Sequence, residues 1–138
     1  MQRPAFSQQV TFLYTNDPAR SFAFYEEVMG LALVLDQGAA RIYRTAGEAY
    51  LGICETSLVQ QGPAPDRKPG GVIFTFVCRT RAEVDVWHGY LAGRGVAFEK
   101  EPALNQTFKI YNCFLRDPDA YLLEIQAFLD PAWPQPRD

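Results

Sequence analysis

The sequence predicts an α+β fold in which one strand–helix–three-strand module occurs twice. Gly30 and Gly95 each follow a short amphipathic helix pattern and precede an extended segment. Residues 49–53 also have a counterpart later in the chain, at 120–125. The offset between the copies is 65 residues at the glycines and 72 residues at the later strand, which indicates a duplicated module with a few insertions.

The first module is expected at about residues 8–55. Its first strand, 9–15, is rich in β-branched and aromatic residues. Asp17 is an N-cap followed by proline at the first helical position, where the missing N–H costs nothing, and the apolar stripe of this helix ends at Gly30. Three short strands follow at 32–36, 40–45 and 49–54.

The second module is expected at about 72–128, after a linker at 56–71 that is rich in proline and glycine. A strand at 72–78 precedes a helix that begins at Thr80, where Thr80 and Glu83 form a capping box. Further strands are expected at 97–100, 109–115 and 121–128. The tail at 129–138, with three prolines, is predicted to be extended and mobile unless Trp133 docks on the domain.

Composition excludes several classes of protein. The 138 residues fit one domain, the net charge is −3, and no basic run suggests a nucleic-acid partner. No apolar run is long enough to cross a bilayer or to act as a signal peptide, so we expect a cytoplasmic protein with no membrane partner. Three widely spaced cysteines without a CxxC motif indicate buried free thiols.

Several short segments match a known pattern in their order and spacing: Gln9 to Phe12, Asp17 to Ser21, Phe24-Tyr25, Met29 to Leu31, and Asp117 to Asp119 followed by Glu124. Together they resemble the vicinal oxygen chelate superfamily, which includes glyoxalase I, extradiol dioxygenases, fosfomycin-resistance transferases and bleomycin-resistance proteins. This resemblance spans about residues 8–128 and implies two βαβββ modules that form an eight-stranded, open, cup-like half barrel, commonly in a homodimer.

The same resemblance implies four metal-ligand positions on the inner face of the cup. They fall on Gln9, Gly52, Val72 and Glu124. Glycine and valine offer no donor, and a catalytic transition-metal site generally needs three or more protein ligands. The only histidine, His88, lies on the second helix. We therefore expect no divalent metal and no other cofactor.

Strand alternation then predicts which side chains line the cup. The expected ligand-binding residues combine aromatic rings with a few polar groups, and Gly52 would leave space among them. The aromatic residues could equally be core packing. The predicted ligand-binding set is Gln9, Thr11, Tyr50, Gly52, Phe74, Phe76, Phe108, Asn112, Phe114 and Gln126.

Glu124 is the candidate acid or base. Burial disfavours a charged carboxylate, so Glu124 could act as a general base or as a protonated donor to a ligand. The structural alternative is a carboxylate paired with Gln9, Arg41 or Arg44. The neighbouring charges Glu99, Lys100 and Glu101 are expected to form a solvated strand end.

Two functions follow from the sequence. The first is a small-molecule binding protein similar to bleomycin-resistance proteins, a homodimer that holds an aromatic or hydrophobic compound in a metal-free cleft. The alternative is a glyoxalase-like lyase, isomerase or dioxygenase that uses Glu124 with a metal or as an acid or base. A degenerate subunit with a filled cleft is a third possibility.

Overall fold

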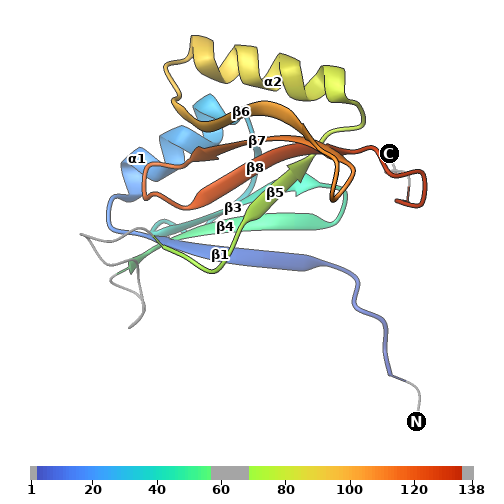
Figure 1. Cartoon of the computed structure of the whole chain (residues 1–138). Helices are drawn as coiled ribbons and strands as arrows, with labels where there is room; N and C mark the ends of the chain where they lie inside the picture. The colour runs from blue at the N-terminus through green and yellow to red at the C-terminus, as the bar shows by residue number, and fades with distance from the viewer. Residues whose placement is uncertain (1–2, 57–68, 135–138) are drawn as a thin grey trace. The chain divides into compact units, whose positions relative to one another are not determined.

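The computed structural model describes residues 3–56 and 69–134 (Figure 1). The chain divides into two compact units, Met1–Pro65 and Asp66–Asp138. Most of the predicted linker and the last four residues of the predicted tail lie outside the described residues. Within the tail, the Trp133 ring stacks on Phe128 with 3.7 Å between ring centroids.

The first unit has the predicted strand–helix–three-strand order. Its four-stranded sheet has the order β1-β4-β3-β2, with β1 parallel to β4 and the other pairs antiparallel. This confirms the first βαβββ module. Its elements are β1 (Gln9–Thr15), α1 (Pro18–Ala23), the π-helix η1 (Phe24–Val28), β2 (Ala32–Asp36), β3 (Ala40–Ala46) and β4 (Ala49–Glu55).

The second unit repeats the same topology. Its sheet has the order β5-β8-β7-β6, again with one parallel pair, β5 with β8 (Figure 1). Strand β5 is shorter than the sequence predicts, and β6 is longer. The elements are β5 (Phe74–Val77), α2 (Arg81–Gly93), β6 (Phe98–Asn105), β7 (Ile110–Arg116) and β8 (Leu122–Phe128).

The first helix begins and ends as its sequence indicates. The Asp17 side chain accepts a hydrogen bond from the Arg20 amide, and Pro18 occupies the first turn. Gly30 has a φ of +68°, the left-handed conformation that glycine adopts at little cost. The π-helix was not predicted; it is marked by the amide of Met29, which donates to the Phe24 carbonyl five residues earlier.

The second helix begins with the predicted capping box. Thr80 accepts from the Glu83 amide, and the Glu83 carboxylate accepts from the Thr80 amide.

We expect Thr80→Ala to lower the free energy of unfolding by about 1 kcal/mol, since it removes the cap. Urea titration measures this difference. Thr45→Ala, which removes an exposed hydroxyl in the first unit, is the control, and equal losses in both variants would contradict the assignment.

Each helix covers one face of its own sheet, and that face carries the buried core. In the first unit the core includes Leu13, Tyr25, Tyr43, Leu51 and Ile53. In the second unit, α2 lies across the sheet (Figure 1) and its side chains Val84 and Leu91 are fully buried. The sheet residues of this second core are Cys113, Leu115, Leu123 and Ile125. The opposite face of each sheet is here called the helix-free face.

Candidate ligand-binding site

A buried carboxylate lies on the helix-free face of the second unit. Glu124 on β8 is 7% exposed, and each of its oxygens accepts a hydrogen bond. The Thr75 hydroxyl donates to Oε1 at 2.7 Å, and the Asn112 amide donates to Oε2 at 2.6 Å. Strand register explains both contacts, because Thr75 on β5 is the Cα partner of Glu124 and Asn112 lies two residues before its partner Phe114 on β7.

The two arginines proposed from the sequence as partners of Glu124 have other partners, within the first unit. Arg41 binds Glu26, and Arg44 donates to the Tyr50 hydroxyl. Both arginines belong to the first unit. Neutral donors of the second unit, Thr75 and Asn112, contact the carboxylate instead.

Lys100 on β6 extends this polar cluster. Its ammonium donates to the Asn112 side-chain oxygen at 2.7 Å and to the Asn112 carbonyl at 2.9 Å. It also lies 5.8 Å from the centroid of the Phe114 ring. A chain of contacts therefore runs from Lys100 through Asn112 to Glu124, and its positive and negative ends balance in charge.

The prediction that Lys100 belongs to a solvated strand end was wrong. Its neighbours Glu99 and Glu101 pair instead with Arg116 and His88. Lys100 is the register partner of Phe114, which lies on the helix-free face, and the register of β6 shifts between Phe98 and Lys100. Because of this irregularity, simple alternation along the sequence could not have placed Lys100.

Gln126 completes the cluster with an unused acceptor. Its side chain is only 6% exposed, and its Oε1 atom is buried without a hydrogen bond among the described residues. It is the Cα partner of Asn112 and of Val77, so it shares the helix-free face with them. A buried, unpaired carbonyl oxygen is costly, and such a group in a folded protein calls for a donor. We call Thr75, Lys100, Asn112, Glu124 and Gln126 the polar cluster.

Of the predicted lining of the second unit, Asn112, Phe114, Glu124 and Gln126 do share one face. Phe74 and Phe76 do not, because their register partners are the core residues Leu123 and Ile125. Phe108 precedes β7 and is 69% exposed. Thr75 was not predicted, because the aromatic residues on either side of it were assigned to the lining and Thr75 therefore to the other face. In the structure, Thr75 is the register partner of Glu124.

The same error occurred in the first unit. Tyr50 and Gly52 lie on the helix-free face, with Val10 and Phe12 of β1 as their register partners. Gln9 and Thr11 alternate with these residues and share the side of Leu13, which is buried in the core. A shift of one residue moves every side chain of a strand to the other face, so Gln9 and Thr11 do not lie with Gly52 as predicted.

Gly52 does not leave open space, as the sequence had suggested. A Cβ atom built on it would lie 2.4 Å from Cδ1 and 2.5 Å from Cε1 of Phe12. The Phe12 ring therefore fills the place that a side chain at residue 52 would take. Glycine is required here for packing against a neighbouring strand.

We expect Gly52→Ala to lower the free energy of unfolding by about 1–2 kcal/mol, because the half-exposed Phe12 ring must swing outward. The double variant with Phe12→Ala should recover most of this loss relative to Phe12→Ala alone. Thermal or urea unfolding of the four proteins measures the coupling. Strictly additive changes would contradict this account of Gly52.

The residues present do not fit a metal ion at the four expected positions. Gly52 and Val72 have no donor, and Gln9 lies on the helix side of its sheet. Glu124 is already held by two neutral donors. No group of three or more His, Cys, Asp or Glu residues suited to a metal occurs within 3–56 and 69–134. Burial raises the pKa of the Cys78 thiol to about 11, which disfavours a thiolate ligand near neutral pH.

Comparison with known proteins identifies the fold. The sequence model of the Glyoxalase/Bleomycin resistance protein/Dioxygenase superfamily matches residues 7–125. No curated protein matches the chain. No helix among the described residues has the length and apolar character to span a membrane.

Two solved structures illustrate the similarity. One is a glyoxalase/bleomycin resistance protein/dioxygenase from Nocardioides, with 22% identity, a TM-score of 0.75, and coverage of 100% of this chain and 92% of the other. The second is a lactoylglutathione lyase from Agrobacterium tumefaciens, with 24% identity, a TM-score of 0.74, and coverage of 95% and 100%. At these identities the likeness supports the α+β fold of paired βαβββ modules.

Proposed function

Because this chain belongs to the Glyoxalase/Bleomycin resistance protein/Dioxygenase superfamily, we propose that it binds a flat, hydrophobic small molecule at the polar cluster without a metal. The observation that carries this proposal is Gln126, whose buried Oε1 has no donor among the described residues. A ligand that brings an N–H or O–H group would satisfy this atom. The other members of the cluster already have hydrogen-bond partners within it.

The surroundings of the cluster favour an uncharged, aromatic ligand. Phe114 and Val77 lie on the same face, and Val77 is 46% exposed. Since Lys100 and Glu124 balance each other in charge, an ion placed beside them would gain little electrostatic energy and would lose its hydration. A neutral ring with one donor fits this environment best.

A matched pair of compounds tests the proposal. Indole carries a ring N–H, whereas 1-methylindole has almost the same shape and no donor. We expect indole to cause saturable shifts in the backbone amide resonances of residues 75–77, 112–114 and 124–126, and 1-methylindole to bind at least tenfold more weakly, as expected for a buried acceptor left unpaired. If neither these compounds nor a wider aromatic library perturbs those residues, the proposal fails.

An enzyme that uses Glu124 as an acid or base is less well supported. Both carboxylate oxygens already accept hydrogen bonds from Thr75 and Asn112. This arrangement suits a residue that positions its neighbours, and the donor set does not fit the metal-dependent alternative.

We also propose that the protein is cytoplasmic, since Cys54, Cys78 and Cys113 are free thiols.

A homodimer is part of the same proposal. Strand β2 is an edge strand of its sheet, and Leu33, Val34 and Leu35 are 41%, 41% and 47% exposed. An exposed apolar edge is a ready surface for pairing with a second chain.

We expect Leu35→Asp to shift the protein from dimer to monomer in light scattering coupled to size exclusion. Val86→Asp, at an exposed position of helix α2 away from any strand edge, is the control. A monomeric unmodified protein would contradict the proposal.

A further inference from the structure

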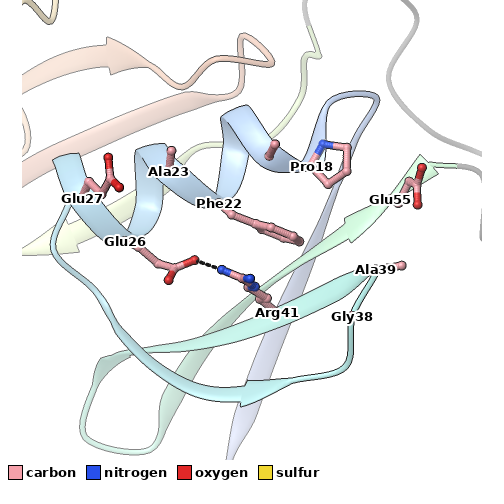
Figure 2. Close-up of a pocket in the computed structure, with 10 residues that line it drawn as sticks. Pro18, Phe22, Ala23, Glu26, Glu27, Gly38, Ala39, Arg41 and Glu55 are labelled. Atoms are coloured by element: carbon pink, nitrogen blue, oxygen red, sulfur yellow. Dashed lines mark hydrogen bonds and ion pairs between the residues drawn. The ribbon is translucent and has the colours of Figure 1, made fainter.

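A cavity separate from the polar cluster has all of its described lining residues in the first unit. It has a volume of about 680 Å³ and opens between the α1–η1 segment and the turn that joins β2 to β3 (Figure 2). This size falls within the range of small-molecule sites. The cavity is lined by Pro18, Ala19, Phe22, Ala23, Glu26, Glu27, Gly38, Ala39, Arg41 and Glu55.

The walls of the cavity are largely apolar and small. Pro18, Ala19 and Ala23 of α1 line it beside the Phe22 ring, and Ala39 of the β2–β3 turn also contributes (Figure 2). The small side chains leave the space open. An apolar body of moderate size would bury its surface against these walls, which is the main favourable term for such binding.

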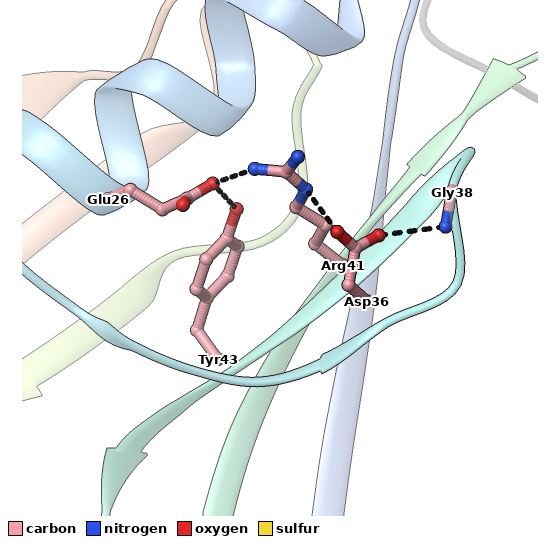
Figure 3. A network of polar contacts seen from close by, with 5 residues as sticks. All are labelled: Glu26, Asp36, Gly38, Arg41 and Tyr43. Carbon is pink, nitrogen blue, oxygen red and sulfur yellow. Dashed lines mark hydrogen bonds and ion pairs between the residues drawn. The ribbon is translucent and has the colours of Figure 1, made fainter.

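Arg41 is the cation among the described lining residues, and it is paired with two carboxylates, although its buried Nε makes no hydrogen bond among the described residues. Its Nη1 atom lies 2.5 Å from Glu26 Oε2, and its Nε atom lies 3.5 Å from Asp36 Oδ2 (Figure 3). Its guanidinium also lies over the Phe22 ring, 4.6 Å from the centroid. The hydrogen bond that Arg41 donates to the Glu26 carboxylate is the main reason that the pKa of Arg41 is raised, so this side chain stays charged and paired. An anion would have to displace these carboxylates.

The remaining lining charges are negative. Glu26 is held by Arg41 and by the Tyr43 hydroxyl at 2.9 Å. Glu27 and Glu55 lie at opposite ends of the lining, and Glu55 stands at the end where Pro18 and Ala39 lie (Figure 2). Among the described lining residues, three carboxylates and one guanidinium give a net charge of −2. Glu26 and Glu27 both come from the π-helix η1, and π-helical turns are frequent at functional sites.

We propose that this cavity is a binding site for an organic cation: a protonated amine whose apolar body packs on Phe22 and the alanines and whose charge faces Glu55. The geometry assigns the site to the helix side of the first unit. It therefore does not depend on the polar cluster, and a ligand at one site can be detected without the other.

Phenethylamine, 2-phenylethanol and 3-phenylpropionate test the proposal, because they share a ring and differ in charge. In a titration at neutral pH followed by backbone amide resonances, we expect saturable shifts with phenethylamine at residues 18–27 and 38–41, with a dissociation constant of about 1 mM. The neutral alcohol should bind more weakly, and the anion should not bind. Equal binding of all three compounds, or no saturable shift at these residues, would overturn the proposal.

Three variants locate the site. Glu55→Gln should weaken phenethylamine binding roughly two- to fivefold, as expected for one partly exposed charge pair. Ala23→Leu should abolish binding by filling the cavity, and its exposed helical position allows the fold to persist. Glu48→Gln makes the same charge change outside the cavity and should leave affinity unchanged. A similar loss in Glu48→Gln would show only a general effect of net charge and would refute the assigned site.

Discussion

Replacing Asn112 by alanine is expected to lower the free energy of unfolding by about 3 kcal/mol. Asn112 is 3% exposed and links the two charged members of the polar cluster. Its amide donates to Glu124, and its side-chain oxygen accepts from Lys100. Alanine would leave a buried carboxylate and an ammonium each short of one hydrogen bond, and bonds to charged groups contribute about 1.5–3 kcal/mol each.

Urea unfolding monitored by circular dichroism measures this loss. Asn105→Ala is the matched control in the same hairpin, because its side chain accepts only one exposed hydrogen bond, from the Phe108 amide. We expect the control to lose less than about 1 kcal/mol. Equal losses in the two variants would mean that the cluster does not act as a connected buried network.

Replacing Gln126 by leucine is expected to weaken the binding of indole at least tenfold and, at the same time, to stabilise the free protein by about 1 kcal/mol. Leucine has a similar volume and removes the buried Oε1 that makes no hydrogen bond. The gain arises because an unsatisfied buried polar atom costs about 1–3 kcal/mol. Opposite changes in stability and affinity are typical of a side chain retained for binding.

Thermal unfolding in the absence of ligand and a titration with indole measure the two effects separately. Gln106→Leu is the control, since Gln106 lies exposed in the turn between β6 and β7. It should change neither quantity. A marked loss of stability in Gln126→Leu would show that Gln126 already has a partner that the leucine removes, which would contradict its proposed role.

The elements of this fold could be predicted well because their signals are local. The Asp17 and Thr80 caps, and the glycines at 30 and 95, act within a few residues of the chain, and both glycines have positive φ. Strand β1 was also predicted with its observed bounds. The repeated order of these elements was enough to predict two βαβββ modules.

The faces of two strands could not be predicted because their sequences do not alternate clearly. On β1, Val10 and Phe12 on one face are as apolar as Leu13 on the other. On β5, the aromatic rings of Phe74 and Phe76 suggested a pocket, yet these residues pair with the core positions of β8. Only the cross-strand register decides such cases, and register depends on residues far away in the sequence.

Other parts of the site depend on side-chain contacts between distant strands. Lys100 reaches Asn112 across twelve residues of sequence, and Thr75 reaches Glu124 across 49. The Phe12 ring occupies the space beside Gly52. This glycine therefore allows close packing, whereas the sequence had suggested that it leaves space for a ligand. The sequence nevertheless identified Glu124, Asn112 and Gln126. Glu124 and Gln126 alternate with apolar residues on β8, and the family resemblance placed Asn112 of β7 on the same face.

The side-chain amide resonances of Gln126 during a titration with indole provide the most direct test of the proposed binding site. These signals report on the atoms that the ligand is expected to contact. The account predicts saturable shifts of the Gln126 side-chain amide with indole and a much smaller response with 1-methylindole at equal concentration. Unchanged Gln126 signals while indole binds elsewhere on the protein would contradict it.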